Sequence, residues 1–161
     1  AHNLSDKISL RLSDGLDNFK ENEVQEIAVA GMGGLLISEF IERTKWLENE
    51  EIHLILQPMT HAEELRKTLF DNGFYIDNEK VAIDGDKLYI IISAYYNGKK
   101  QKYSDLDLIC GCLPTNTDEN SLIYLNHLFE KYNKKLVALK KAEKDCVELE
   151  KIVEELKKWQ Q

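Results

Sequence analysis

Three short stretches of the sequence carry residue types that could hold a ligand close to a protein backbone. The run "VAGMGG" (Val29–Gly34) places glycines directly after apolar residues, and glycine lets a backbone approach a flat ligand because it has no Cβ atom. Gln57 precedes Pro58 in "LILQP", and its amide can both donate and accept hydrogen bonds. Asp14 precedes Gly15 in "LSDGL". Each stretch also has a simpler interpretation: a tight strand-to-helix turn, a strand-ending proline beside a surface glutamine, and an Asp-Gly turn.

The elements around these stretches predict an α/β sheet. Alternating apolar and polar residues predict a strand at Ile8–Leu12, and apolar runs predict strands at Glu26–Ala30 and Glu51–Pro58. Glu26–Ala30 is nearly all apolar, as expected of a strand that is covered on both faces. Two further β-rich runs flank Asp84-Gly85-Asp86 and predict a hairpin. Helical patterns separate the first strands, so the sheet should be parallel at first and antiparallel at its edge.

The helix predicted after Pro58 has signals at both ends. Thr60 and Glu63 have the spacing of a capping box. Gly73 follows Asp71 closely and is typical of a helix C-terminus. A helix is therefore predicted from this cap to about Asp71.

The predicted turns bring the three stretches to one rim. In sheets of this kind, ligands bind in the crevice at the carboxyl ends of the parallel strands. Asp14, Gly31–Gly34 and Gln57-Pro58 each follow a predicted strand at that edge. The sequence therefore predicts a single site built from three turns.

The C-terminal region has the apolar spacing of helices that pack against each other. Two heptad seams are out of phase, which fits either one continuous helix with a stammer or two antiparallel helices that turn near Lys140–Asp145. We favour the hairpin, because it buries both seams without a partner. The predicted domains are residues 1–97 for the sheet, 98–118 for a linker loop and 119–161 for a coiled-coil helical hairpin.

The composition limits which classes of protein this chain can belong to. A chain of 161 residues with 43% hydrophobic residues suffices for one domain, or for a small domain with an appendage. The net charge of −8 argues against a surface that coats nucleic acid, although residues 131–161 carry more lysines than acids. No stretch approaches the roughly 18 apolar residues that span a bilayer. Three cysteines without a framework spacing fit a reducing cytoplasm, and Cys110 and Cys112 lack a second ligand pair for zinc, so no metal is expected.

Five stretches of the sequence are "LSDKISLRLSDGL", "VAGMGGLLI", "LILQP", "LRKTLFDNGFYI" and "DGDKLYIIISAYY". In this order and spacing they resemble the bacterial TrmK-like tRNA (adenine(22)-N(1))-methyltransferases, and the resemblance covers nearly the whole chain. It implies a partial class I (Rossmann-like) methyltransferase sheet with an antiparallel edge hairpin, followed by a C-terminal helical coiled-coil hairpin. It also implies an enzyme that uses S-adenosyl-L-methionine to methylate N1 of an adenine in the tRNA D-arm, with tRNA as its partner.

The sequence departs from the family at its start. Family members begin with a further strand–helix–strand portion that carries a "GSDHAYL"-like stretch, the first glycine loop around the cofactor, and nothing here matches it. The chain alone is therefore expected to be inactive. The sheet is expected to have an open edge beside Glu26–Ala30, through which copies of the chain could associate.

The resemblance implies roles for residues at the rim and on the tail, but it identifies no catalytic base. The implied cofactor-binding residues are Asp14, Gly15, Leu16, Ala30, Gly31 and Met32. The implied substrate-binding residues are Gly33, Gly34, Gln57 and Pro58, and Met59 stands where the family usually has Asn. The residues expected to meet the tRNA backbone are Lys131, Lys134, Lys135, Lys140, Lys141 and Lys144.

Two other functions stay open on sequence alone: a non-catalytic RNA- or protein-binding module, and a class I methyltransferase with a different substrate. The glycine turn lacks the Asp/Asn-Pro-Pro-aromatic motif with which related enzymes hold an exocyclic amine. Adenine N1 has an in-plane lone pair that can attack a methyl group once the base leaves its pair. Such an enzyme mainly has to place the base and tolerate a cationic product.

Overall fold

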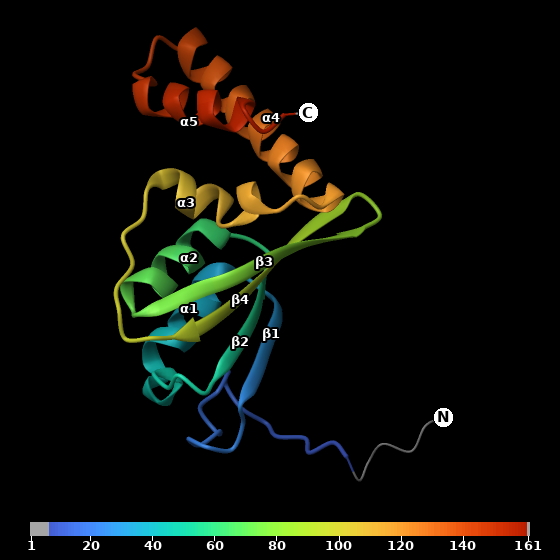
Figure 1. The fold of residues 1–161 in the computed structure, drawn as a ribbon, viewed down its shortest axis with the longest axis vertical. Coiled ribbons are helices and arrows are strands. Elements are labelled where there is room, and N and C mark those ends of the chain that lie inside the picture. The colour runs from blue at the N-terminus through green and yellow to red at the C-terminus, as the bar shows by residue number, and fades with distance from the viewer. Residues whose placement is uncertain (1–6, 161) are drawn as a thin grey trace.

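The computed structural model describes residues 7–160 and contains a four-stranded mixed sheet (Figure 1). The strand order is β1-β2-β4-β3; β1 and β2 are parallel, and β4 is antiparallel to both of its neighbours. The predicted α/β sheet with an antiparallel edge hairpin is confirmed. The strands are β1 (Glu26–Met32), β2 (His53–Pro58), β3 (Phe74–Asp84) and β4 (Lys87–Tyr96).

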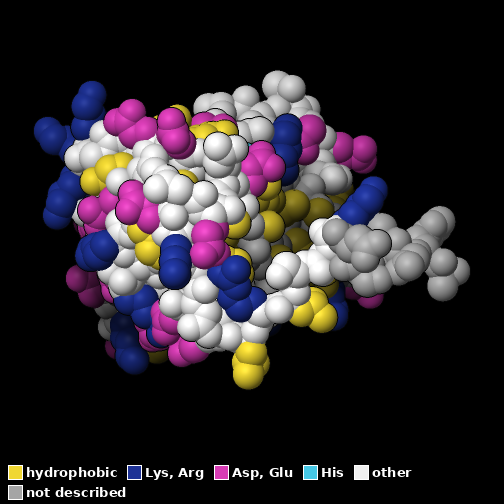
Figure 2. Space-filling view, turned by 90° about the horizontal axis from the view of Figure 1, so that it is seen from below, with side chains coloured by type: hydrophobic (Ala, Val, Ile, Leu, Met, Phe, Trp, Pro, Cys, Tyr) yellow, Lys and Arg dark blue, Asp and Glu magenta, His cyan; other side chains and the backbone are white. Residues whose placement is uncertain are grey.

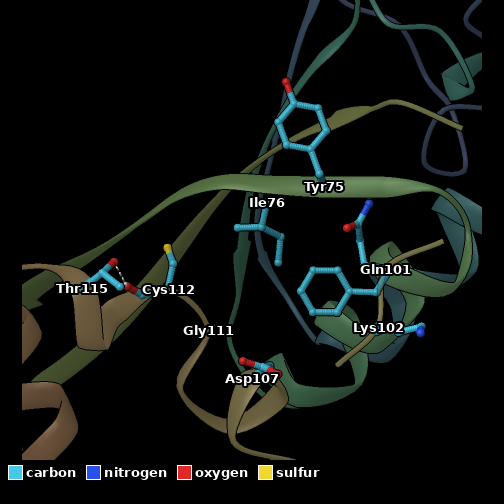
Figure 3. A pocket seen from close by; sticks show the side chains of 9 residues that line it. Tyr75, Ile76, Gln101, Lys102, Asp107, Gly111, Cys112 and Thr115 are labelled. Carbon is cyan, nitrogen blue, oxygen red and sulfur yellow. Dashed lines mark hydrogen bonds between the residues drawn. The ribbon is translucent and has the colours of Figure 1, made fainter. Parts of the chain in front are cut away.

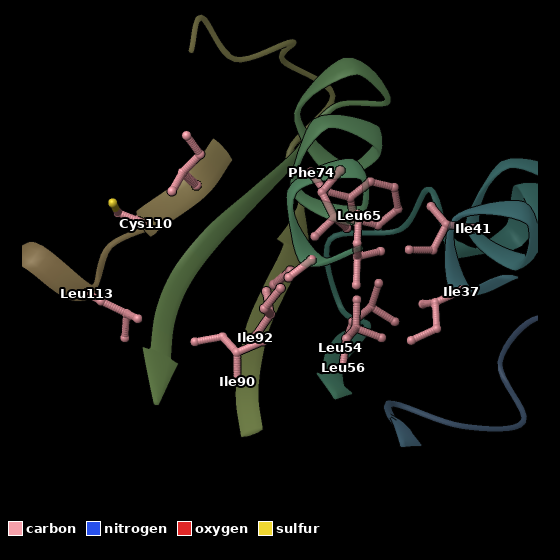
Figure 4. Close-up of a cluster of buried hydrophobic side chains, with 14 of the residues drawn as sticks. Ile37, Ile41, Leu54, Leu56, Leu65, Phe74, Ile90, Ile92, Cys110 and Leu113 are labelled. Carbon is pink, nitrogen blue, oxygen red and sulfur yellow. The ribbon is translucent and has the colours of Figure 1, made fainter. Parts of the chain in front are cut away.

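Helices α1 (Gly34–Arg43) and α2 (Ala62–Asp71) cover one face of this sheet. Successive strand side chains point to opposite faces, so alternate residues of the central strands β2 and β4 are buried. Fully burying one Leu or Ile side chain contributes about 1.5–3 kcal/mol, which makes this layer the main apolar contribution to stability. The layer includes Leu54, Leu56, Ile90 and Ile92 of the strands and Ile37, Ile41 and Leu65 of the helices (Figure 4). Ile27 and Leu69 belong to the same buried cluster.

The other face of β1 is open within residues 7–160. Ala28 and Ala30 of β1 and Ile55 of β2 are exposed there. The expectation that β1 is covered on both faces is wrong for the described part of the chain, because α1 and α2 lie on the same side of the sheet. Seen from below, the molecule is hollowed beside the segment that precedes β1, with hydrophobic side chains visible in the hollow (Figure 2).

The strand predicted at Ile8–Leu12 is absent. Leu10 is 92% exposed and Leu12 is 96% exposed, so the apolar side chains of the alternating pattern point into solvent. Arg11 instead binds the backbone carbonyl of Asn18 and the carboxylate of Glu23, and the segment runs as a loop. A strand needs a neighbour for its backbone hydrogen bonds, and no described strand lies beside this segment.

The predicted capping box of α2 is also absent. The N-cap position belongs to His61, which has a left-handed backbone (φ 56°) and makes no side-chain capping bond. Thr60 uses its backbone carbonyl to accept a hydrogen bond from Gly34 N, at 2.7 Å. The helix ends at Asp71 as predicted, and Gly73 follows with a φ of +83°.

A buried ion pair joins α2 to the edge strand β3. Arg66 and Glu79 have fully buried side chains, and the guanidinium donates to both carboxylate oxygens at 2.8 and 3.0 Å. Arg66 also donates to the backbone carbonyls of Leu108 and Ile109. The pair therefore fixes α2, β3 and the segment of residues 108–109 to one another.

The predicted loop between sheet and tail contains regular structure. Helix α3 (Asp105–Cys110) begins with a capping box of Ser104 and Asp107, and the short 3-10 helix η2 (Leu113–Thr115) follows. Leu113 is fully buried in the main core. Another 3-10 helix, η1 (Lys45–Leu47), lies between α1 and β2.

The tail is a helical hairpin, which confirms the favoured of the two sequence interpretations. Helix α4 (Glu119–Lys141) and helix α5 (Val147–Lys157) run antiparallel, and Leu136, Leu149 and Val153 are buried between them. The start of α4 packs back onto the sheet, where Asn120 donates to the carbonyl of Val81. Within residues 7–160, no helix is both long and apolar enough to cross a membrane.

Candidate functional site

The glycine turn after β1 has a backbone shape that depends on glycine at one position. The pairing of β1 with β2 shifts register between Ala30 and Met32, and Gly31 between them has a φ of +78°. Residues other than glycine rarely adopt this backbone conformation. A Cβ atom on Gly31 would meet no heavy atom within 4 Å, so the space beside this backbone is open. The turn therefore presents an exposed, unobstructed stretch of main chain.

Gln57 braces this turn. Its Oε1 atom accepts a hydrogen bond from Gly31 N at 2.9 Å, and its Nε2 atom lies 3.3 Å from the carbonyl of Pro58. Nε2 also lies 3.4 Å from the sulfur of Met59. The amide that could read a nucleobase edge is thus turned onto the protein backbone in this structure, while Pro58 beside it is buried.

Gly34 is required by packing between the two β–α turns. Its N atom donates to Thr60 O at 2.7 Å, and Met59 N donates to Met32 O at 2.8 Å. A Cβ atom on Gly34 would lie 2.2 Å from the carbonyl oxygen of His61, a distance that no side chain tolerates. The turns at the ends of β1 and β2 therefore form one closely packed unit, as the common rim predicted.

Asp14 lies elsewhere. Arg43, the last residue of α1, donates to the Asp14 carbonyl at 2.9 Å, and its Nη2 lies 3.4 Å from the Asp14 carboxylate. A Cβ atom on Gly15 would lie 2.7 Å from the ring of Phe40, and Leu16 packs against the main core.

The glycine turn is at the opposite end of α1, about 13 Å away along the helix axis. The structure thus brings together two of the three predicted turns. Asp14 is apart from them because the strand that was to position it does not form.

A cavity of about 150 Å³ lies beside the β2–α2 turn, under helix α4. Pro58, Thr60 and His61 line it from the turn, and Tyr124 and Lys131 line it from α4. Sequence reasoning assigned no role to His61 or Tyr124. No sequence pattern predicts the positive φ of His61. Its position shortly after Pro58, on the rim, is the one sequence feature that indicates a place at the site.

Glu63 connects this turn to α4. Its Oε1 atom lies 3.5 Å from Lys131 Nζ and 3.4 Å from the Tyr132 hydroxyl, which donates to it. Burial acts to raise the pKa of Glu63, but a backbone hydrogen bond and Lys131 outweigh it and hold that pKa below its usual value. Burial and the neighbouring carboxylate raise the pKa of Tyr132. The Glu63 carboxylate therefore lies between the Tyr132 phenol and the Lys131 ammonium group.

The lysines expected to meet tRNA are all exposed on the hairpin. Lys140 pairs with Glu150 at 2.7 Å, and Glu150 raises the pKa of Lys140. Within the described residues, Lys134, Lys135, Lys141 and Lys144 form no ion pair. These four ammonium groups are thus available to an anionic partner.

A chain of polar groups on the open face of the sheet does not form a nucleophile. His53 Nε2 lies 2.8 Å from Ser93 Oγ, and Ser93 donates its proton to Asp77 at 2.6 Å. Since the serine proton points to the aspartate, the histidine does not act as the base for this hydroxyl. Among residues 7–160, no cluster of His, Cys, Asp or Glu could hold a metal ion.

A larger cavity of about 350 Å³ lies between β3 and the α3–η2 segment (Figure 3). Its polar groups serve local structure: Asp107 caps α3 through Ser104, and the Thr115 hydroxyl donates to the carbonyl of Cys112 at 2.7 Å. Burial raises the pKa of the Cys112 thiol to about 11, so this thiol is protonated at neutral pH. Nothing in this cavity converges on a ligand.

Comparisons with known proteins identify relatives over the whole chain. A family model described as "TrmK: tRNA (adenine(22)-N(1))-methyltransferase" matches residues 1–161. A Bacillus subtilis protein named tRNA (adenine(22)-N(1))-methyltransferase is 32% identical over 124 residues, which are 76% of this chain and 52% of that protein. This chain therefore spans about half the length of that curated relative.

Solved structures share the fold. A Streptococcus pneumoniae protein, provisionally assigned as a tRNA (m1A22) methyltransferase, superposes with a TM-score of 0.78 and 28% identity over 98% of this chain and 72% of that one. The same protein has been solved in complex with S-adenosyl-L-methionine, with a TM-score of 0.76, 28% identity and coverage of 98% of this chain and 71% of that one. A Streptococcus agalactiae protein of the NADB-Rossmann superfamily gives 0.76 with 26% identity, over 99% of this chain and 70% of that one.

Proposed function

Because the chain belongs to the TrmK family of tRNA (adenine(22)-N(1))-methyltransferases, we propose that it forms part of an enzyme that methylates N1 of an adenine in the tRNA D-arm, with S-adenosyl-L-methionine as methyl donor. The observation that carries this proposal is the family match over residues 1–161. A tRNA substrate would place the enzyme in the cytoplasm.

The glycine turn supports a flat ligand at the end of β1. Gly31 has an exposed backbone with open space where a Cβ would be, and Ala30 beside it is exposed as well. Ala30, Gly31 and Met32 are proposed to lie against the cofactor, and Gly33, Gly34, Gln57 and Pro58 against the target base. Gly34 has a packing role in any case, because His61 leaves no room for a side chain there. Asp14, Gly15 and Leu16 complete the proposed cofactor set only if their loop moves toward this rim.

The chemistry asks little of the protein beyond placement. Bound S-adenosyl-L-methionine supplies an electrophilic methyl group on a sulfonium centre. Adenine N1 would take this methyl group through its lone pair while the electrons of the carbon–sulfur bond stay with sulfur, so the product base would be cationic. Residues of the rim would hold the base out of its pair with N1 directed at the methyl group, a contribution of orientation that can lower a barrier by several kcal/mol. No general base is needed to remove a proton from N1, which carries a free lone pair.

The helical hairpin is the proposed tRNA-binding part. Its lysines are exposed, and four of the six proposed contacts have no ion-pair partner among the described residues. Lysine contacts to phosphates position an RNA without reading its sequence. We further propose that copies of this chain can associate through β1, because its outer edge has no strand partner within residues 7–160.

Methyl transfer to a tRNA transcript tests the proposal. The native protein is incubated with labelled S-adenosyl-L-methionine, and 1-methyladenosine is detected by mass spectrometry of the digested RNA. The Bacillus subtilis relative serves as the positive control, and a transcript with guanine in place of the target adenine serves as the negative control. Labelling that persists undiminished on the guanine transcript would contradict the assigned position. Absence of labelling and of tRNA binding would leave a non-catalytic protein-binding module.

A further inference from the structure

The six tail lysines do not share one environment. Lys131 lines the 150 Å³ cavity beneath α4, whose other wall is the β2–α2 turn. Lys134, Lys135, Lys140, Lys141 and Lys144 are not among the residues that line it. Lys131 therefore borders the turn that is packed against the glycine turn, whereas the other lysines lie farther along the hairpin.

Two contacts hold the Lys131 ammonium group at this position. Its Nζ atom lies 3.5 Å from Glu63 Oε1 and 5.3 Å from the centroid of the Tyr132 ring. Both partners are partly solvated, with the Lys131 side chain 56% exposed and that of Glu63 31% exposed. An ion pair of this kind contributes only about 0–1 kcal/mol. An incoming anion can therefore replace Glu63 at small cost in free energy.

Glu63 would not be left without a partner by such an exchange. The Tyr132 hydroxyl donates to the same Oε1 atom at 3.4 Å. Two other exposed acids belong to the same elements: Glu64 follows Glu63 in α2, and Glu130 precedes Lys131 in α4. A phosphate on Lys131 would lie within the Debye length of about 8 Å from Glu63, so salt does not remove their repulsion. The negative charge of Glu63 therefore opposes the exchange, and its removal should strengthen phosphate binding.

The geometry of the rim decides which anion can arrive there. The turn that ends β2 is bonded to the glycine turn through Gly34 N and Thr60 O, at 2.7 Å. Glu63, the contact of Lys131, is three positions after Thr60 in the sequence. A base that leaves its stack to reach the rim brings its own backbone phosphates with it. Those phosphates lie close to the extruded base, whereas phosphates of the paired stem do not.

We propose that Lys131 binds a phosphate that flanks the target adenosine, exchanging Glu63 for that phosphate. Lys134 and Lys135, one turn further along α4, contact phosphates elsewhere on the tRNA. This assignment rests on the proposed function, and it separates one lysine that holds the reacting nucleotide from lysines that only hold the molecule.

Binding of chemically modified tRNA tests the assignment without requiring catalysis. Two synthetic tRNAs carry an uncharged methylphosphonate, one on the 5′ side and one on the 3′ side of the target adenosine. Their affinities for the native protein and for its Lys131→Gln and Lys134→Gln variants are measured by fluorescence anisotropy at one salt concentration. The wild type should lose about two- to fivefold affinity for one modified tRNA, as expected for an exposed ionic contact. Lys131→Gln should bind that tRNA and the unmodified one equally, whereas Lys134→Gln should show the full wild-type loss.

Glu63 provides a second arm. Glu63→Gln should raise the affinity for unmodified tRNA in the wild-type background and leave it unchanged in Lys131→Gln, because Glu63 acts by occupying Lys131. Glu64→Gln, on the same helical turn, controls for the general loss of a negative charge and should have equal effects in both backgrounds. Equal losses for wild type and Lys131→Gln at both modified phosphates would overturn the assignment while leaving tRNA binding intact. A failure of the proposed function would differ, because no 1-methyladenosine would then form on the unmodified tRNA, whatever its affinity.

Discussion

Replacement of Gly111 by alanine probes how tightly the buried pair of Arg66 and Glu79 holds the fold together. Gly111 follows α3 as its C-cap, with φ 57° and ψ −142°, a backbone conformation that residues other than glycine rarely adopt. A Cβ atom there would lie 2.1 Å from Glu79 Oε2 and 2.4 Å from Cδ. The carboxylate cannot withdraw freely, because Arg66 holds both of its oxygens and both side chains are fully buried.

Two terms set the expected loss of stability. Backbone strain at such a position costs about 1–3 kcal/mol. Displacing Glu79 from Arg66 leaves buried charges without partners, which costs about 3–5 kcal/mol. We therefore expect Gly111→Ala to lower the free energy of unfolding by about 4 kcal/mol or more, a large share of the roughly 5–15 kcal/mol of a typical domain.

Gly85→Ala is the matched control. Gly85 has nearly the same φ, +56°, but a Cβ atom there would meet no heavy atom within 4 Å. Its replacement should therefore show the strain term alone. Guanidinium denaturation followed by far-UV circular dichroism gives the free energy of unfolding of both variants and the wild type. If Gly111→Ala lost no more stability than Gly85→Ala, the argument that Glu79 is fixed in place by Arg66 would be refuted.

Three further outcomes are expected. Folding lowers the pKa of Glu63, so Glu63 contributes to stability at a pH above its usual pKa of 4.5, and this contribution is lost as the pH falls through the lowered pKa of the folded state. In Glu63→Gln the free energy of unfolding should therefore fall less steeply at acid pH, and an unchanged slope would show that Glu63 is not involved. Asp14 is 76% exposed and bound to Arg43, away from the glycine turn, so Asp14→Ala should leave S-adenosyl-L-methionine affinity unchanged in calorimetry, whereas a loss of about 1–3 kcal/mol would show that its loop moves to the rim. Charge reversal of Lys134 and Lys135 should lower tRNA affinity and the slope of its salt dependence while leaving cofactor affinity unaltered; a variant with wild-type salt dependence would remove these lysines from the interface.

Local patterns in the sequence sufficed for much of the fold. The turn at Asp84-Gly85-Asp86 and the order of strands and helices follow from periodicity and turn chemistry, which act over a few residues. The two seams of the tail predicted its hairpin for a related reason, since each seam needs an apolar partner and the other seam is the nearest one. The family motifs also lie within short stretches, so the amino-acid sequence alone was enough to indicate the family.

Local sequence patterns gave wrong predictions for segments whose structure depends on residues far away in the sequence. Ile8–Leu12 alternates like a strand, but a strand exists only where another backbone pairs with it, and none of the described strands does. The spacing of Thr60 and Glu63 matched a capping box, yet Thr60 is engaged by Gly34 and Glu63 by α4. In both cases tertiary contacts overrode a local preference that amounts to about 1 kcal/mol.

The candidate site shows the same division. The sequence by itself determined that glycines and Gln57-Pro58 follow neighbouring strands, and hence that they share a rim. Only the tertiary structure decided that the Gln57 amide faces Gly31, 26 residues away, and that Lys131 meets Glu63, 68 residues away. Such contacts depend on how whole elements pack, and packing is set by the summed burial of many side chains. The chemical type of a side chain limits which groups it can bind, and the packing of the folded chain determines which of those groups lies within reach.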